Sequence, residues 1–418
     1  MIDANPLMLR HCRGLSAFLC TALSVLLSPS IQAESLTLTG HLDPGAATEH
    51  RAVSHNTMSV TLTTLASFDG TNGRDPFTSL LEGTDGNFYG TTYGGGSYGS
   101  GTVFEVTPSG TLTTLVSFKS VGGVEPKAGL VQGTDGDFYG TTFYNYNLPL
   151  SLGPNNGTVF KLTSSGIRTK LASFSGINGA HPGSNLLQGA DGNFYGTTQQ
   201  GGTSKEGVVF RMTPAGQLTA LASFTGDNGK TPNAIIQGQD GNFYGTTSEG
   251  GTGNEGVVFK VTPSGTLTTL LSFDGANGQE PNAGLTLGTD GNFYGTTFSG
   301  GANGEGTVFK ITPSGTQTVL VSFDGTDGQG PNGSVVEGTD GNFYGTTSGG
   351  GANGQGTVFA MSPSGAFTTL LSFNGANGDT PNEGLTLGTD GSFYGTTYYG
   401  GANGEGTVFK LTVNGPTP

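Results

Sequence analysis

Residues 281–323 read PNAGLTLGTDGNFYGTTFSGGANGEGTVFKITPSGTQTVLVSF and contain four short runs separated by turn signals. The runs AGLTLG, NFYGTT, GTVFKIT and TQTVLVSF are rich in Thr, Val, Phe and Tyr, which pleated strands prefer. Thr-Asp-Gly-Asn and Pro-Ser-Gly supply the turns, because Asn, Asp and Gly tolerate positive φ and Pro presets φ at a turn corner. The stretch therefore predicts four antiparallel strands in about 50 residues.

The same unit recurs seven times. The steps between successive FYG tyrosines are 50, 56, 49, 50, 50 and 50 residues, with these tyrosines at Tyr89, Tyr139, Tyr195, Tyr244, Tyr294, Tyr344 and Tyr394. No stretch after residue 33 shows helical periodicity. Seven units of four antiparallel strands are typical of an all-β, seven-bladed β-propeller.

The ends of the repeat region predict how the ring closes. The region opens with a lone fourth-strand run, TLTTLASF at 61–68, and its last complete phrase is a third-strand run, GTVFKLT at 406–412. In a ring, the N-terminal strand joins the last blade and removes the open sheet edges. A parallel β-helix is the alternative, but its coils are shorter and have little use for three tight turns per unit. We therefore expect the propeller at residues 58–413, followed by a tail at 414–418.

The repeated phrases also resemble a known family. GTDGNFYGTT (288–297), GGANGEGTVFK (300–310) and TPSGTLTTLLSF (262–273) are similar to the Gloeo-Verruco tandem repeat of bacterial exported proteins. Members are described as choice-of-anchor proteins, because different sorting tails follow the repeats. The resemblance implies an exported, propeller-like protein and supplies no catalytic residues. Residues 413–418 read VNGPTP and contain no apolar anchor, which favours free secretion.

The N-terminus has the pattern of a secretory signal. Arg10, His11 and Arg13 precede an apolar run at 15–27, and Ala33 offers a small residue for cleavage. The run is shorter than the roughly 20 residues of a spanning helix, and an uncleaved anchor is the alternative. We expect a signal peptide at 1–33, a flexible leader at 34–57, and a secreted protein without a membrane span after cleavage. The periplasm and the cell surface are alternative locations.

Charge and cysteine content exclude several classes of function. Both cysteines, Cys12 and Cys20, lie in the predicted signal, so the mature chain has no thiol for disulfides, metal sites or catalysis. Removing residues 1–33 takes away Arg10, Arg13 and Asp3 and changes the net charge from −15 to −16. This charge repels nucleic acid and anionic lipid, so neither is an expected partner.

The repeated aromatic residues predict a core in a chain that is only 33% hydrophobic. Successive strand residues point to opposite faces, and a blade is packed on both faces. The adjacent Phe and Tyr of each FYG phrase can therefore both be buried.

No cofactor is expected, and Ca²⁺ is the one metal that the loops suggest. The loops around Asp69, Asp274, Asp324 and Asp327 could bind Ca²⁺, but they lack the ordered ligand spacing of a calcium loop, and solvated loops are favoured. His181 is the only histidine of the repeats, so no multi-histidine metal site or Ser-His-Asp triad is expected there.

Candidate binding residues lie where the repeats differ. The longer loops, between second and third strands and between blades, share one face of a propeller, and aromatic residues gather there in blades 1, 2 and 7. The predicted ligand-binding residues are Tyr93, Tyr98, Phe143, Tyr144, Tyr146, Tyr398 and Tyr399. Ring closure places blade 7 beside blade 1, and tyrosine combines a flat apolar face with a hydroxyl, which suits sugars or protein surfaces. The alternative is that these rings cover the edge of the disc or pack on the leader.

The sequence therefore favours a secreted, non-catalytic binding or surface-interaction protein, with an extracellular glycan or a surface protein as its partner. A polysaccharide lyase or glycosidase is the first alternative. The basic candidates for a lyase within the repeats are His181, Arg74, Arg168 and Arg211. A purely structural repeat protein is the second alternative.

Overall fold

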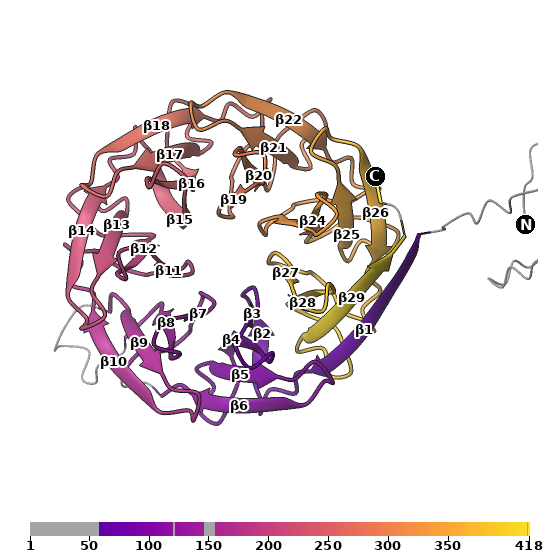
Figure 1. Ribbon diagram of the computed structural model, residues 1–418, viewed down its shortest axis with the longest axis horizontal. Helices are drawn as coiled ribbons and strands as arrows, with labels where there is room; N and C mark the ends of the chain where they lie inside the picture. Colours follow the sequence, from indigo (N-terminus) through magenta and orange to yellow (C-terminus); the bar gives the residue numbers. More distant parts are fainter. Residues whose placement is uncertain (1–57, 120–121, 146–154, 416) are drawn as a thin grey trace, which may run out of the picture. The chain divides into compact units, whose positions relative to one another are not determined.

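The computed structural model describes residues 58–119, 122–145, 155–415 and 417–418, which all belong to one unit, His55–Pro418. Its strands form seven antiparallel sheets placed around a ring, and no helix occurs in these ranges (Figure 1). The prediction of an all-β, seven-bladed propeller is confirmed. The predicted signal peptide and leader lie outside the described residues.

Each blade has four strand positions, counted outward from the ring centre. The first position holds β3 (Leu81–Glu82), β7 (Val131–Gln132), β11 (Leu187–Gln188), β15 (Lys230–Gln237), β19 (Thr286–Leu287), β23 (Val336–Glu337) and β27 (Thr386–Leu387), and blade 1 adds β2 (Arg74–Pro76). The second holds β4 (Phe88–Gly94), β8 (Phe138–Thr142), β12 (Phe194–Thr198), β16 (Phe243–Glu249), β20 (Phe293–Thr297), β24 (Phe343–Thr347) and β28 (Phe393–Thr397). The third holds β5 (Thr102–Val106), β9 (Thr158–Leu162), β13 (Val208–Met212), β17 (Val257–Val261), β21 (Thr307–Ile311), β25 (Thr357–Met361) and β29 (Thr407–Asn414). The fourth holds β6 (Leu112–Ser117), β10 (Arg168–Ser173), β14 (Leu218–Ser223), β18 (Leu267–Ser272), β22 (Gln317–Ser322), β26 (Phe367–Ser372) and β1 (Ser59–Ser67).

The first strand of most blades is shorter than the sequence predicts. In blade 5 only Thr286 and Leu287 pair with β20, although the run AGLTLG suggested a longer strand. The residues before Thr286 instead run along the centre of the ring, where the strand has a sheet neighbour on one side only. This stretch positions the channel side chains described below.

The two ends of the repeat region meet in one sheet. β1 and β29 form eight antiparallel pairs, from Ser59↔Asn414 to Ser67↔Thr407. Figure 1 shows indigo β1 alongside yellow β29 at the outer edge of blade 7. The predicted closure of the ring by the N-terminal strand is therefore present.

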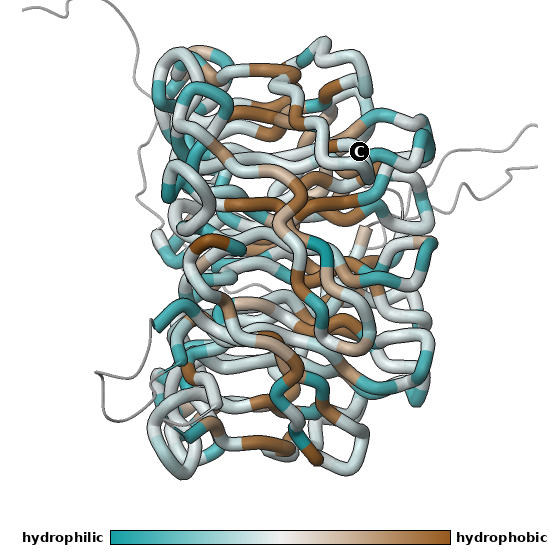
Figure 2. The backbone as a smooth tube through the Cα atoms, turned by 90° about the vertical axis from the view of Figure 1, so that its left-hand side faces the viewer, coloured by the Kyte–Doolittle hydropathy of each residue, from teal (hydrophilic) through white to brown (hydrophobic). Residues whose placement is uncertain are grey.

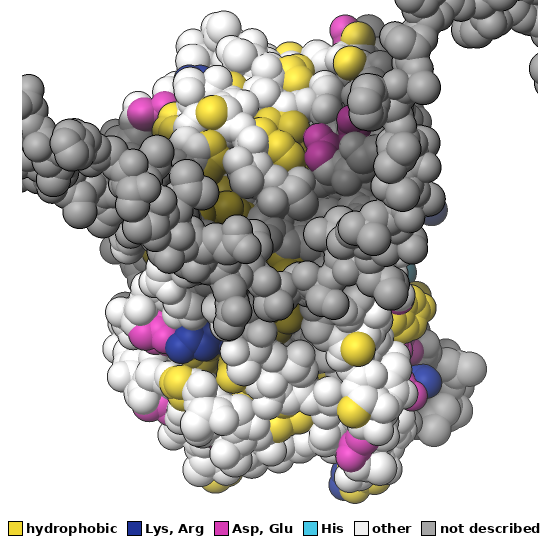
Figure 3. Space-filling model, turned by 90° about the vertical axis from the view of Figure 1, so that its right-hand side faces the viewer, with side chains coloured by type: hydrophobic (Ala, Val, Ile, Leu, Met, Phe, Trp, Pro, Cys, Tyr) yellow, Lys and Arg dark blue, Asp and Glu magenta, His cyan; other side chains and the backbone are white. Residues whose placement is uncertain are grey.

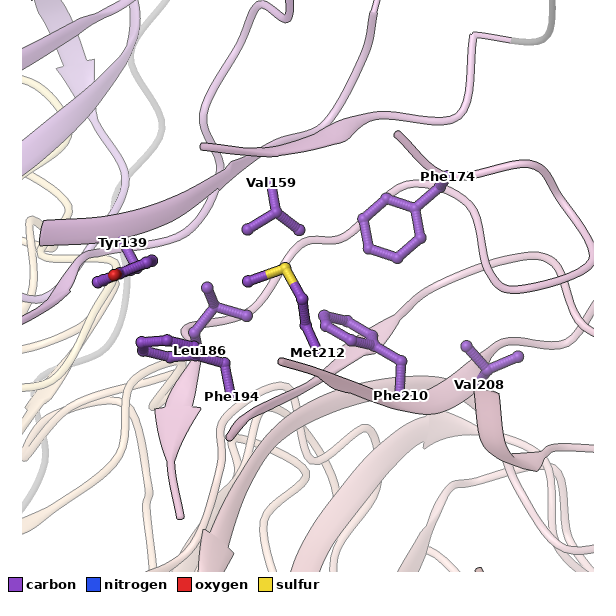
Figure 4. Packing of buried hydrophobic residues seen from close by; sticks show 8 residues of the cluster. All are labelled: Tyr139, Val159, Phe174, Leu186, Phe194, Val208, Phe210 and Met212. Atoms are coloured by element: carbon purple, nitrogen blue, oxygen red, sulfur yellow. The ribbon is translucent and has the colours of Figure 1, made fainter. Parts of the chain in front are cut away.

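The hydrophobic core lies between blades. The described residues form seven buried clusters, one at each contact between neighbouring blades. Figure 4 shows the contact of blades 2 and 3, where Tyr139 and Val159 face Phe194, Phe210 and Met212. In the edge-on view of Figure 2, hydrophobic segments lie midway between the two loop faces of the propeller, and hydrophilic segments gather toward the loops.

One aromatic contact recurs at every interface. The FYG tyrosine of each blade packs on the FYG phenylalanine of the next, with ring centroids 3.8–4.2 Å apart. At the closing interface Tyr394 stacks on Phe88 at 3.8 Å. Both residues of the FYG phrase are buried in all seven blades, as the sequence predicts.

Candidate binding face and central channel

A strained backbone position recurs on the long-loop face. Each blade has a proline at the same place before its first strand, and the residue before this proline has φ between 54° and 60°. These residues are Asp75, Glu125, His181, Thr231, Glu280, Gly330 and Thr380. Six of them are not glycine, and residues before proline disfavour helical conformations as well. Such strain persists only where the surroundings impose it.

Backbone hydrogen bonds impose this conformation. The Glu280 N–H donates to Glu255 O in the preceding blade at 3.0 Å, and Glu280 O accepts from the Phe298 N–H at 3.0 Å. Equivalent bonds to the preceding blade occur at all seven positions. Because the backbone fixes the position, its side chain can vary between blades, which suits a recognition surface.

Aromatic residues from blades 7, 1 and 2 gather on this face. We call Phe77, Tyr93, Phe143, Tyr144, Tyr398 and Tyr399 the aromatic sector. The Tyr398 ring lies edge-on to Phe77 of blade 1 at 5.9 Å and to Tyr399 at 4.5 Å. Closure of the ring therefore brings residues from both ends of the repeat region into contact.

Lys127 joins the blade 1 and blade 2 parts of the aromatic sector. Its Nζ lies 4.0 Å from the Phe143 ring centroid and 5.4 Å from the Tyr93 centroid. The Tyr93 hydroxyl donates to Glu125 Oε2 at 2.8 Å. Burial lowers the pKa of the Lys127 ammonium, although nearby Glu125 acts in the opposite direction.

The predicted ligand-binding residues differ in exposure. Phe143 is buried and stacks on His181 at 5.0 Å, whereas Tyr93, Tyr144 and Tyr398 are partly buried. Tyr98 and Tyr399 are 54% and 49% exposed and are the two that present a ring to solvent. Tyr98 contacts Lys119 rather than a ring of the aromatic sector.

Two further outcomes concern this set. Tyr146 lies outside the described residues. Phe77 contacts Tyr398 but was not predicted, because it stands in the run that enters the first strand and not in a loop. One sequence feature could have pointed to Phe77: it directly follows the proline of its blade, where four other blades have asparagine. These are Asn233, Asn282, Asn332 and Asn382.

The basic candidates for a lyase lie on separate elements. His181 Nδ1 is 3.0 Å from Gln200 Oε1 and its Nε2 is 3.1 Å from Asn155 O. Arg74 pairs with Asp75 at 3.7 Å in blade 1. Arg168 lies on the outermost strand of blade 2, and Arg211 lies on the third strand of blade 3. Within the described ranges, no hydrogen bond or ion pair joins any two of these four candidates.

The aspartates considered for Ca²⁺ serve their own turns. Asp69 Oδ1 accepts from the Thr71 N–H at 2.9 Å, the Thr71 hydroxyl at 2.8 Å and the Asn72 N–H at 2.9 Å. Asp324 makes the corresponding bonds to Thr326 and Asp327. Within the described ranges, no group of three or more His, Cys, Asp or Glu side chains is placed to hold a metal ion.

The centre of the ring contains a polar cavity of about 280 Å³. Its lining comes from the residues just before and within the first strands, including Lys127, Asn185, Asn282 and Glu383. The Glu383 side chain is partly exposed to the cavity, and desolvation by the surrounding blades raises the pKa of its carboxyl to about 8. Sequence reasoning missed Glu383, although PNEGL (381–385) differs from PNAGL (281–285) only at this position.

The repeat identifies the family. The model of the Gloeobacter/Verrucomicrobia repeat matches residues 28–186, 151–289 and 236–417. The chain belongs to this family. No curated protein matches it.

Solved structures share the fold of this Gloeobacter/Verrucomicrobia repeat protein. A streptogramin B lyase is 16% identical, with a TM-score of 0.59 over 85% of this chain and 98% of that one. Virginiamycin B lyase from Staphylococcus aureus is 14% identical, with a TM-score of 0.58 over 85% of this chain and 99% of that one. At such identities the similarity establishes the propeller fold alone.

Surface features agree with the low content of charge. Charged side chains are few and scattered on the coloured part of the side shown in Figure 3. No helix within the described ranges is long and apolar enough to cross a membrane.

Proposed function

We propose that this protein is an exported binding protein whose aromatic sector takes an extracellular glycan. The Tyr398–Tyr399 pair carries the proposal, because Tyr399 is half exposed and Tyr398 is held against Phe77 of the next blade. A sugar ring can stack on an exposed tyrosine face while its hydroxyls bond the phenolic oxygen. The fixed backbone around the sector favours binding, since little conformational entropy is lost when the ligand docks.

The name lyase belongs to the two proteins of similar fold, and we propose no lyase activity for this chain. The basic candidates His181, Arg74, Arg168 and Arg211 lie apart, as described above. Turnover of a polysaccharide by the purified protein would contradict the binding role.

A glycan array with matched variants tests the sector. Tyr399→Ala and Tyr398→Ala should weaken binding at least tenfold, which is about 1.4 kcal/mol. Phe298→Ala is the control, because Phe298 occupies the Tyr398 position in blade 5 and is 38% exposed. Equal binding by the wild type and both tyrosine variants, or an equal loss in Phe298→Ala, would overturn the assignment.

Export is a separate part of the proposal and rests on the signal pattern of residues 1–33. Expression of the full chain in a bacterial host should release a protein that begins at Glu34. N-terminal sequencing of the extracellular and periplasmic fractions measures this, and an uncleaved chain retained in the cytoplasm would contradict it.

A further inference from the structure

The central cavity is small and is lined by residues from all seven blades. Its volume of about 280 Å³ is at the lower end of the range for ligand sites. Inner strands approach closely here, since a Cβ at Gly333 would overlap the backbone of Gly384, and a Cβ at Gly384 would overlap Ser334 O. The wall next to Glu383 is therefore made of backbone that has little freedom to move.

Most polar groups of the lining already bond to one another. Asn185 Oδ1 accepts from the Gly129 N–H at 2.6 Å, and Asn185 Nδ2 donates to Ser79 Oγ at 3.2 Å. The Ser334 hydroxyl donates to Gly284 O at 3.0 Å. The bonds to Gly129 and Gly284 join neighbouring blades, and the bond to Ser79 joins blade 3 to blade 1.

The Glu383 carboxyl differs from these groups. Within the described ranges its backbone oxygen accepts from the Thr346 hydroxyl at 2.8 Å, but no hydrogen bond or ion pair reaches its carboxyl. The equivalent residues of other blades are small, among them Ala128, Ala283 and Gly333. The Glu383 side chain lines the cavity and is partly exposed there, so its carboxyl is available to bond a molecule bound in the cavity.

We propose that the channel binds a small neutral molecule with several hydroxyl groups, of monosaccharide size, and that the Glu383 carboxyl hydrogen-bonds it. The lining of amide and hydroxyl groups provides both donors and acceptors for such a molecule. Lys127 contacts both this site and the aromatic sector, but the Tyr398–Tyr399 pair does not line the channel, and the proposal does not depend on glycan binding at that pair.

The charge state of the lining favours a neutral ligand. At neutral pH most Glu383 carboxyls are protonated, because burial raises their pKa to about 8, and a protonated carboxyl both donates and accepts hydrogen bonds. The other titratable group of the lining is Lys127, whose ammonium lies over the Phe143 ring. The Lys127 ammonium would repel a cationic ligand. The ionised fraction of the Glu383 carboxyl would repel an anionic ligand.

Saturation-transfer NMR on the purified protein tests the channel, with D-glucose, D-galactose, D-mannose and myo-inositol as probes at pH 6.5. We expect at least one probe to bind the wild type and to bind Glu383→Ala at least tenfold more weakly. Tyr399→Ala is the control and should bind that probe as the wild type does, which separates this site from the aromatic sector. Absence of binding by all four probes, or equal binding by Glu383→Ala, overturns the proposal.

A second variant keeps the test valid if Glu383→Ala fails to fold. Glu383→Gln retains a neutral donor and acceptor, so its affinity at pH 6.5 should stay within about threefold of the wild type. Between pH 7 and pH 9 the wild-type affinity should fall about tenfold as the carboxyl ionises, while that of Glu383→Gln should not change. The same pH profile for both proteins would contradict the role of Glu383.

Discussion

At the scale of single residues, each blade repeats a hydrogen bond between the FYG tyrosine and the aspartate four residues before it. Tyr hydroxyls donate to Asp Oδ2 at 2.6–2.9 Å in all seven blades. In blade 5 burial alone would raise the pKa of Asp290, but hydrogen bonds from Asn292 and Tyr294 hold it below its ordinary value. Burial and this hydrogen bond raise the pKa of Tyr294.

Tyr294→Phe tests this bond. The ring that stacks on Phe343 is retained, but a hydrogen bond to a charged group is lost, so the free energy of unfolding should fall by about 1.5–3 kcal/mol. Tyr98→Phe is the control, since Tyr98 is exposed, and its effect should stay within about 0.5 kcal/mol. Urea denaturation at pH 7 measures both, and an unchanged midpoint for Tyr294→Phe would contradict the role of the bond.

The raised pKa of Glu383 predicts that the protein loses stability as the pH rises. The lowered pKa of a turn aspartate such as Asp290 predicts a loss as the pH falls. The pKa of Glu383 is raised in the folded protein, so the folded state is most stable below about pH 4.5 and loses stability as the pH rises through about 8. Glu383→Gln should therefore match the wild type near pH 4 and exceed it at pH 9 by a few kcal/mol, since one pKa unit is about 1.4 kcal/mol. Thermal melts across this range measure the difference. A wild type as stable as Glu383→Gln at pH 9 would contradict the raised pKa of the Glu383 carboxyl.

At the scale of elements, the second and third strands of a blade meet where a glycine is required. A Cβ added to Gly295 on β20 would lie 2.6 Å from Phe309 Cζ on β21, and the equivalent glycines of other blades meet the same ring. The FYG glycine thus makes room for the phenylalanine of the next strand, which fills the space between blades.

Gly295→Ala should lower the free energy of unfolding by about 1–3 kcal/mol, the usual cost of overpacking a core. Gly349→Ala is the matched control, because its nearest neighbouring atom would be 3.6 Å away and its φ is not positive. Guanidinium denaturation compares the two variants. Equal stability of both would mean that the ring of Phe309 moves aside without cost.

The strand pattern could be predicted because it follows from local chemistry. Runs rich in Thr, Val and Phe bounded by Asp-Gly and Pro-Ser-Gly turns gave the second, third and fourth strands of each blade. The first strand was predicted too long, because the stretch from Pro281 to Leu285 has strand-like composition but no partner on the channel side. The strained residues before proline were not foreseen, since only contacts with the preceding blade impose them.

At the scale of the whole molecule, the fold was readable from the repeat period and from the strands at its two ends. The candidate sites were less so, because they are assembled across blades. Contact of Tyr398 with Phe77 needs closure of the ring, and isolation of the Glu383 carboxyl needs all seven first strands in place. Burial of this kind depends on sequence positions that are hundreds of residues apart, which local patterns do not reveal.

Pairing of β1 with β29 is the central claim, and an engineered disulfide tests it most directly. Thr61 and Thr412 are paired across these strands, so Thr61→Cys with Thr412→Cys, in a chain with Cys12→Ser and Cys20→Ser, should close a bond within one molecule. Thr61→Cys with Thr262→Cys is the control, because Thr262 occupies the Thr412 position in blade 4. Peptide mapping by mass spectrometry under non-reducing conditions should find the 61–412 disulfide in the monomer and free thiols in the control. Free thiols at 61 and 412, or bonds between molecules only, would contradict a ring closed by its first strand.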